Sequence, residues 1–362
     1  MASGPTVVIA GGGTGGHLMP GLAVAQELRR AAAEIVFVGT ARGLESRLVP
    51  EAGYELQLIG IAGLKGRGWG QRLATLGQLP FAVAQSVGIL RRARAKVVFG
   101  IGGYASGPVL AAAALMRIPV VVLEVNATTG LANRLAARWV EAAAVNFPET
   151  GKDFRGARVE VTGIPVREAF FAPPPATTAA TVPDPPLVLA FGGSQGAHAL
   201  NQVVSDLVRS DRLPVRWRHQ TGAADYAAIA AGYELLRARV RAEAFIGDMP
   251  EAMAAAEVVV CRAGASTLGE IAAAGRAAIL VPFPAAADQH QLRNAQAFAR
   301  AGAAVLLEQR EMTSATLAET ISKLLNDDRQ RRAMAEAARG FAHPRAAQQI
   351  ASLILAAAAQ SN

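Results

Sequence analysis

Short apolar runs alternate with longer amphipathic segments along the chain. In the first half the runs are TVVIA, EIVFVGT, KVVFGIG, PVVVLEV and AAAVNF, and most are rich in β-branched residues. The segment between each pair of runs is long enough to hold a helix. Parallel strands that are covered by helices on both faces give this alternation, so we expect an α/β domain with a doubly wound parallel sheet.

A proline-rich stretch, FFAPPPATTAATVPDPP (Phe170–Pro186), interrupts the alternation. It cannot form a regular helix or a central strand, so we interpret it as a linker. The alternation then resumes with LVLAFGG, a helix from about Ala197, VRWRHQTG, RAEAFIGD, EVVVCRAG, AAILVPF and AAVLLEQ. A helical pattern from Pro344 closes the chain without a further strand. We therefore expect two doubly wound domains.

Composition and charge narrow the class of protein. The chain is 52% hydrophobic and 18% charged, which excludes global disorder. Its net charge is +8, of which residues 1–166 carry +7, so the first half is expected to meet an anionic surface, either nucleic acid or membrane. The single cysteine, Cys261, ends an apolar run and should be a buried small residue. We expect no secretory signal, no transmembrane helix and no metal site.

A glycine-rich segment, AGGGTGGHLMPG (Ala10–Gly21), lies between the first apolar run and a helix-like run, Gly21–Ala31. Glycine permits positive φ and close approach of backbone amides to a ligand, and the helix N-terminus that follows favours phosphate. The glycine spacing matches the dinucleotide fingerprint, but the second strand lacks the acidic residue at its end that NAD or FAD requires. No Gly-Lys-Ser/Thr follows, which excludes a P-loop. A turn that serves packing alone remains the alternative.

Two further glycine segments follow strands in the same way. They are GIGGYASGP (Gly100–Pro108) and FGGSQGAHALN (Phe191–Asn201), the second of which opens the second domain. Three such corners indicate two anionic ligands that meet across a cleft, one on each domain.

Four segments together, in this order, resemble the MurG family of peptidoglycan glycosyltransferases, of the glycosyltransferase family 28 type. They are GGGTGGHLMPGLAVAQEL, GIGGYASGP, FGGSQGAHALN and CRAGASTLGEIAAAGRAAILVPFP. The resemblance implies a GT-B fold, with two Rossmann-like domains facing a cleft and a C-terminal helix (343–362) that returns to the first domain. Residues 1–166 would bind the acceptor and the membrane, and residues 167–342 would bind UDP-N-acetylglucosamine (UDP-GlcNAc).

The reaction implied by the resemblance is an inverting transfer of N-acetylglucosamine to the C4 hydroxyl of the muramoyl-pentapeptide of lipid I, which gives lipid II for peptidoglycan synthesis. No cofactor is implied. The enzyme would work as a peripheral protein at the cytoplasmic face of the bacterial inner membrane, with other cell-wall or division proteins as further partners. The alternatives are a GT-B transferase for another lipid acceptor, a UDP-sugar epimerase, and a non-catalytic nucleotide-sugar-binding partner.

On the donor side, the resemblance places Arg167 near the diphosphate, the Ile246 backbone on the uracil and Glu270 on the ribose hydroxyls. It also implies donor contacts for Ser194, Gln195, Ala265, Ser266, Thr267, Leu268, Gly269 and Gln291, with His290 at a neighbouring polar position. Simpler interpretations compete at two places. Thr267 and Glu270 have the spacing of a helix capping box, and Asp288–Gln291 resembles a helix N-cap.

In the first domain, His17 is the candidate general base, because the acceptor hydroxyl must lose a proton and an imidazole titrates near neutrality. Glu124 is the rival base, and Asn126 would reach the donor sugar. The family usually reads His-Glu-Gln-Asn here, whereas this chain reads Leu-Glu-Val-Asn. The resemblance also implies donor contacts for Thr14, Gly15 and Gly16, and contacts with the acceptor diphosphate for Gly13, Gly102, Gly103 and Tyr104.

The stretch Leu64–Lys96 mixes seven basic residues with Trp69, Phe81 and several leucines. We interpret it as a patch that rests on anionic lipid, and a core-facing helix with a solvated basic face is the alternative. Nucleic acid is disfavoured, because no binding motif is present and aromatic residues make up only 5% of the chain.

Overall fold

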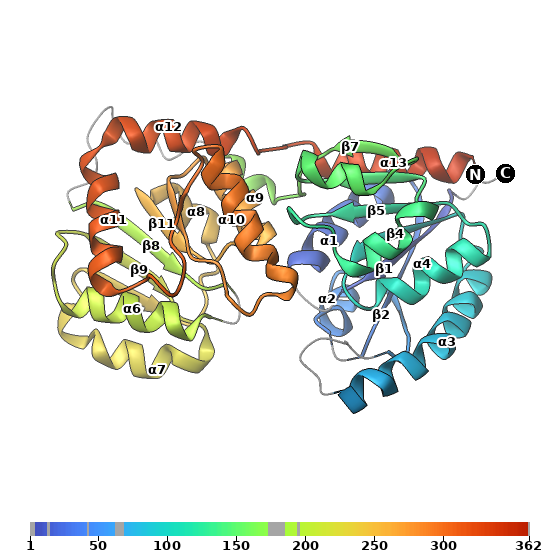
Figure 1. Cartoon of the computed structure of the whole chain (residues 1–362), viewed down its shortest axis with the longest axis horizontal. Helices are drawn as coiled ribbons and strands as arrows, with labels where there is room; N and C mark the ends of the chain where they lie inside the picture. Colours follow the sequence, from blue (N-terminus) through green and yellow to red (C-terminus); the bar gives the residue numbers. More distant parts are fainter. Residues whose placement is uncertain are drawn as a thin grey trace. The chain divides into compact units, whose positions relative to one another are not determined.

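The computed structural model describes residues 4–12, 15–41, 43–61, 69–172, 185–193 and 196–360, with the backbone alone at 15, 69–76 and 287. The chain divides into two compact units (Figure 1). The first comprises Met1–Pro165 together with Arg345–Asn362, and the second comprises Val166–Pro344.

The first unit is built on a seven-stranded sheet in which all paired strands are parallel. The strand order is β3-β2-β1-β4-β5-β6-β7, so the direction in which the sheet grows reverses between β1 and β4. Open α/β sheets bind ligands at the carboxyl ends of the strands beside such a switch point. The strands are β1 (Thr6–Gly11), β2 (Glu34–Gly39), β3 (Glu55–Leu58), β4 (Val97–Gly102), β5 (Val120–Glu124), β6 (Ala142–Val145) and β7 (Arg158–Val161).

Helices cover this sheet, and the last helix of the chain belongs to it. The expected return of the C-terminal helix is confirmed, because α13 packs on α1 and on β4, β5 and β6. Its buried face is apolar, with Ile350 and Ile354 fully enclosed. The helices are α1 (Gly15–Arg30), α2 (Glu45–Glu51), α3 (Trp69–Arg92), α4 (Ser106–Leu115), α5 (Leu131–Ala136), η1 (Ala137–Trp139), η2 (Pro148–Asp153) and α13 (Ala346–Ala359).

The second unit repeats the design with a parallel six-stranded sheet of order β10-β9-β8-β11-β12-β13. Its switch point lies between β8 and β11. The strands are β8 (Leu187–Phe191), β9 (Arg216–Gln220), β10 (Val240–Glu243), β11 (Val258–Cys261), β12 (Ala278–Leu280) and β13 (Val305–Leu306). The helices are η3 (Glu168–Phe171), α6 (His198–Arg209), α7 (Ala223–Gly232), η4 (Glu234–Leu236), α8 (Met249–Ala255), α9 (Ala265–Ala274), η5 (Ala287–Gln289), α10 (His290–Arg300), α11 (Ser314–Asn326) and α12 (Asp328–Arg339).

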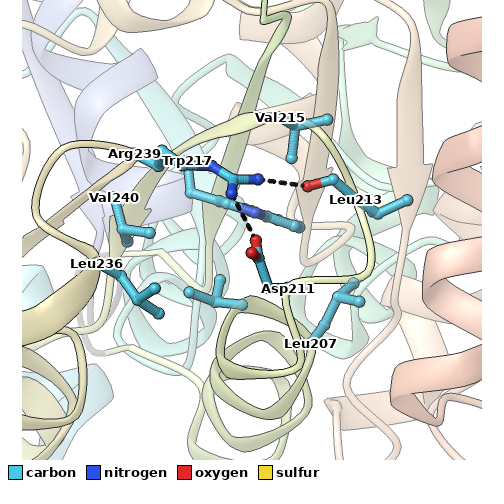
Figure 2. Close-up of a pocket in the computed structure, with 9 residues that line it drawn as sticks. Leu207, Asp211, Leu213, Val215, Trp217, Leu236, Arg239 and Val240 are labelled. Atoms are coloured by element: carbon cyan, nitrogen blue, oxygen red, sulfur yellow. Dashed lines mark hydrogen bonds and ion pairs between the residues drawn. The ribbon is translucent and has the colours of Figure 1, made fainter.

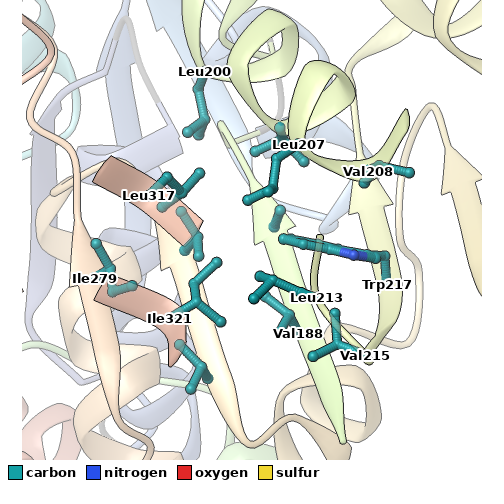
Figure 3. Close-up of a cluster of buried hydrophobic side chains, with 14 of the residues drawn as sticks. Val188, Leu200, Leu207, Val208, Leu213, Val215, Trp217, Ile279, Leu317 and Ile321 are labelled. Atoms are coloured by element: carbon teal, nitrogen blue, oxygen red, sulfur yellow. The ribbon is translucent and has the colours of Figure 1, made fainter. Parts of the chain in front are cut away.

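A continuous apolar core holds the second sheet to its helices (Figure 3). Leu200 and Leu207 of α6 and Leu317 and Ile321 of α11 point towards the strands, around Trp217 of β9. Each of the four aliphatic side chains is at most 1% exposed. Burial of one such side chain stabilises a fold by about 1.5–3 kcal/mol, so this core is a main source of the stability of the second unit.

Most expected elements are confirmed, with two differences. The edge strands β3 and β7 were not expected, because their sequences, ELQL and RVEV, are polar and partly exposed. Helix α1 begins at Gly15 and not at Gly21, so Pro20 lies inside it. Of the expected linker, residues 173–184 lie outside the described part of the chain. Cys261 is fully buried, as expected.

Candidate active site

The two glycine loops of the first unit meet at its switch point, one after β1 and the other after β4. The Gly12 amide donates to the Gly102 carbonyl oxygen over 3.3 Å. Gly102 and Gly103 have φ of +89° and +84°, and a Cβ on Gly103 would overlap the carbonyl oxygen of Gly12. The two backbones are therefore in direct contact, which requires glycine at these positions.

His17 lies beside this contact. The structure corrects its expected place: it belongs to the first turn of α1 and does not end the loop, because α1 begins at Gly15. Its ring lies against β4, since a Cβ on Gly102 would be 2.8 Å from His17 Nδ1. Gly16 shares the same first turn. The expected contacts of Gly13 and Thr14 fall on residues outside the described ranges.

Glu124 ends β5 and is only 2% exposed. Its Oε1 accepts from the Asn126 amide (3.1 Å) and from Asn126 Nδ2 (3.5 Å), and its Oε2 accepts from the Gly130 amide (2.8 Å) and from Asn133 Nδ2 (3.0 Å). Burial raises the pKa of this carboxyl, and the four hydrogen bonds that it receives oppose the rise. Both oxygens are engaged, so the carboxyl holds the loop that carries Asn126.

In the second unit, Arg167 and Glu270 come together although they are far apart in sequence. Arg167 precedes η3, which packs against the α9 helix that carries Glu270. Desolvation raises the pKa of Glu270 to about 7, and the positive charge of Arg167 lowers it in part. The arrangement brings a guanidinium and a poised carboxyl to one place.

The capping-box interpretation of Thr267 and Glu270 is wrong. Helix α9 begins at Ala265, after Gly264, and no side chain caps it, so Glu270 lies in its second turn. Glu270 is therefore available for a role other than capping. The remaining predicted donor residues of this segment form the first turns of α9, directly after β11 at the switch point: Ala265, Ser266, Thr267, Leu268 and Gly269.

The N-cap interpretation of Asp288–Gln291 is also wrong. Asp288 and Gln289 both have φ near +50°, and α10 begins at His290 without a side-chain cap. Gln291 Oε1 accepts from the Phe283 amide over 2.9 Å. Gln291 therefore braces the loop after β12, and its amide nitrogen is the group that remains for a ligand.

Gln220, at the end of β9, connects two loops of the second unit and was missed by the sequence analysis. Its Oε1 accepts from the Ile246 amide (2.8 Å), and its Nε2 donates to the Gly193 carbonyl oxygen (3.0 Å). The loop predicted to contact uracil is thus linked to the glycine loop after β8. Ser194 and Gln195 of that glycine loop lie outside the described residues.

A buried polar network ties α6, the helix that follows this glycine loop, to β9 and α7. Asn201 Nδ2 donates to the Thr221 carbonyl oxygen and to Asp225, both over 2.7 Å, and His219 Nε2 lies 3.2 Å from Asn201 Oδ1. Burial lowers the pKa of His219 to about 4, so the ring is neutral. Its Nε2–H therefore donates to Asn201, and its Nδ1 accepts from the Tyr233 hydroxyl (2.9 Å). Asn201 is the last residue of the FGGSQGAHALN segment, but only the fold shows its hydrogen-bond partners.

The remaining features lie elsewhere. A cavity of about 10 Å³ beside Trp217 is enclosed by Leu213, Val215 and Leu236, which precede the strands and so mark the amino edge of the sheet (Figure 2). It is too small for a substrate.

Within the described residues, no cluster of three His, Cys, Asp or Glu side chains could hold a metal ion. No described helix has the length and hydropathy needed to cross a membrane.

Two parallel α/β units, each with loops gathered at a topological switch point, define the GT-B class of nucleotide-sugar enzymes. Residues 7–145 match the glycosyltransferase family 28 N-terminal domain, and residues 187–350 match the family 28 C-terminal domain. The chain belongs to glycosyltransferase family 28.

Relatives and solved structures agree with this assignment. A protein of Anaeromyxobacter dehalogenans, named UDP-N-acetylglucosamine–N-acetylmuramyl-(pentapeptide) pyrophosphoryl-undecaprenol N-acetylglucosamine transferase, is 46% identical over 96% of this chain and 92% of its own. The crystal structure of Acinetobacter baumannii MurG is 31% identical, with a TM-score of 0.80 over 97% of this chain and 99% of its own. UDP-GlcNAc 2-epimerase from Neisseria meningitidis, at 12% identity over 97% of this chain and 100% of its own and a TM-score of 0.65, shares the fold alone.

Proposed function

We propose that the protein transfers N-acetylglucosamine from UDP-GlcNAc to the C4 hydroxyl of the muramoyl-pentapeptide of lipid I, with inversion, and so forms lipid II. The observation that carries this choice of substrates is the 46% identity, across nearly the whole chain, to a relative named for that transfer. The epimerase alternative is supported by a fold likeness at 12% identity only.

For the donor, the second unit offers a set of groups that suits a nucleotide sugar. Arg167 would pair with the diphosphate, since a guanidinium matches phosphate oxygens with charge-assisted hydrogen bonds. Glu270 in its ionised form would accept from both ribose hydroxyls, and the Ile246 backbone would contact the uracil. The N-terminus of α9 would stabilise negative charge on the departing UDP.

For the acceptor, the first unit supplies the candidate base. The C4 oxygen would attack the anomeric carbon as the bond from that carbon to the UDP oxygen breaks, and His17 would take the C4 proton. Glu124 is the weaker candidate, because both its oxygens are engaged in holding the loop that bears Asn126. We therefore assign Glu124 a positioning role towards Asn126.

The decisive experiment is transfer of radiolabelled N-acetylglucosamine from UDP-GlcNAc to a short-chain lipid I analogue. Lipid-linked label is expected with the analogue and none without it. Label on a different prenyl-linked sugar alone would indicate another lipid acceptor, and conversion of UDP-GlcNAc without any acceptor would indicate an epimerase. Binding of UDP-GlcNAc with no reaction would indicate a non-catalytic partner. His17→Ala should abolish transfer, whereas loss of transfer only in Glu124→Gln would reverse the assignment of the base.

The protein would find its lipid acceptor as a peripheral protein at the cytoplasmic face of the inner membrane. Phe81 of α3 is 64% exposed and Leu115 at the end of the adjacent α4 is 73% exposed, and Arg91 and Arg92 of α3 are exposed. Exposed apolar and basic side chains on two neighbouring helices suit an anionic lipid surface. Phe81→Ser should weaken co-sedimentation with phosphatidylglycerol vesicles while transfer to a soluble acceptor analogue is unchanged; equal binding of the two proteins would exclude this face.

A further inference from the structure

The Glu45 carboxyl lies in a pocket lined by glycine backbone. Glu45 opens α2 and is 1% exposed. A Cβ on Gly12 would come within 2.5 Å of the carboxyl carbon, and a Cβ on Gly39 within 2.5 Å of Cγ. Space for this carboxyl is therefore left by the ends of β1 and β2 and by the turn before α2. A buried carboxylate is unfavourable without hydrogen-bond donors, so its partners indicate what it does.

A chain of hydrogen bonds links Glu45 to Tyr104 through Thr40. The amide and the hydroxyl of Thr40 both donate to Glu45 Oε1 over 2.9 Å. The Thr40 hydroxyl oxygen is also 3.0 Å from the Tyr104 hydroxyl oxygen. A carboxylate only accepts, so the single hydroxyl proton of Thr40 goes to Glu45. Thr40 must then accept from Tyr104, and the phenol proton of Tyr104 points to Thr40.

This direction limits what Tyr104 offers to a ligand. Tyr104 directly follows the Gly102–Gly103 loop at the switch point and is partly exposed. With its proton committed to Thr40, its oxygen presents lone pairs only. Lone pairs attract a hydroxyl or an amide N–H, and they repel the oxygens of a diphosphate, which are themselves acceptors.

We infer that Glu45, acting through Thr40, makes Tyr104 a hydrogen-bond acceptor for a hydroxyl or amide N–H on the sugar or peptide of the acceptor substrate. Glu45 and Thr40 are positioning residues in this arrangement. The inference rests on the proposed acceptor role of the first unit. It also replaces the expectation that Tyr104 binds the acceptor diphosphate, and it leaves that task to backbone amides of the glycine loops.

The first test is Tyr104→Phe, which removes the phenol oxygen and keeps the ring. We expect kcat/KM for the lipid I analogue to fall about three- to tenfold, the loss of one neutral hydrogen bond, with KM for UDP-GlcNAc unchanged. A short prenyl diphosphate without a sugar is the control ligand, and its inhibition constant should not change. Weakening of this inhibitor to the same extent as the acceptor would show that Tyr104 binds diphosphate and would overturn the inference.

The second test separates the hydrogen-bond chain from a general structural effect. Thr40→Val removes the hydroxyl, and Thr40→Ser is the matched control that keeps it. Thr40→Val should lower kcat/KM for the acceptor about as much as Tyr104→Phe, and the double variant should be no worse than either alone. Additive losses in the double variant would show that Thr40 does not act through Tyr104 and would refute the inference. Calorimetry measures direct binding of the analogue to the unaltered protein. Binding of the analogue without transfer of sugar would contradict the proposed function and leave this inference standing.

Discussion

The two units build their switch points in different ways. In the first, the glycine loops after β1 and β4 touch backbone to backbone, and the Gly12 amide bonds directly to the Gly102 carbonyl oxygen. In the second, side chains connect the loops: Gln220 joins the Ile246 and Gly193 segments, and Asn201 joins α6 to β9 and α7. At this backbone contact the first site tolerates almost no added atom, whereas these loop connections of the second site are side-chain hydrogen bonds that can be removed one at a time.

Gly103→Ala should have the largest effect. Its Cβ would overlap the Gly12 carbonyl oxygen, and alanine would be strained at φ of +84°. We expect transfer to fall about a hundredfold, since small displacements of a site are costly to catalysis, and the free energy of unfolding to fall by about 1–3 kcal/mol. Gly107→Ala, in the adjacent α4, is the matched control. Its added Cβ would meet no atom of a neighbouring segment within 4 Å, so this variant should keep near-normal transfer. Equal behaviour of the two variants in transfer assays and urea titrations would contradict the backbone-contact account.

Asn201→Ala should have the next largest effect, in the second unit. It leaves the buried His219 Nε2–H and the Thr221 carbonyl oxygen without this partner. A buried polar group that loses its hydrogen-bond partner destabilises a protein by about 1–3 kcal/mol, and UDP should bind more weakly because α6, which follows the glycine loop, is no longer tied to β9 and α7. Urea unfolding measures the stability, and calorimetry measures the affinity for UDP. His198→Ala is the control, because it removes only an exposed contact with Asp225 (2.9 Å) at the margin of the network, and it should change neither quantity by much. A stable Asn201→Ala protein would show that the network is dispensable.

Glu270 gives the second site a pH dependence that the backbone contacts of the first site do not share. Because only the ionised carboxylate accepts from two ribose hydroxyls and its pKa is about 7, UDP affinity should rise about tenfold from pH 6 to pH 8. The folded pKa is raised, so without ligand the free energy of unfolding should fall as pH rises through about 7. Glu270→Gln should make both profiles flat by calorimetry and urea titration. If the affinity of Glu270→Gln for UDP still rises with pH, another group causes the pH dependence.

The smallest effect is expected at the amino edge of the second sheet. Arg239 pairs with Asp211 over 2.7 Å, with side chains 38% and 55% exposed (Figure 2). Exposed pairs contribute little, so Arg239→Gln should change the free energy of unfolding by less than about 1 kcal/mol and leave transfer unchanged. A kinetic defect in this variant would mean that function is not confined to the carboxyl edges.

The sequence predicted the central strands and the places of the glycine loops, because buried β-branched runs and glycine clusters are local signals. It did not predict β3 or β7, whose short alternating segments resemble loops. It misplaced the start of α1, since glycines and Pro20 locally disfavour a helix that tertiary packing imposes. Gln220 escaped notice because its partners follow two other strands, and no spacing rule encodes such contacts. Glu45 and Thr40 are five residues apart, but the contact of Thr40 with Tyr104, after β4, is likewise shown only by the fold.

The return of α13 to the first sheet has a consequence for synthesis of the chain. Val166–Pro344 is an insertion within the first unit, because the segment that completes that unit, Arg345–Asn362, follows it in the chain and is translated after it. The ribosome therefore releases every residue of the inserted unit before the earlier one can acquire its final helix. Since domains fold as units during translation, the first unit would be completed only after the inserted unit has been made. A truncation before Ala346 would leave the buried surface of α1 and of β4 to β6 uncovered, while the inserted unit would keep all its own elements.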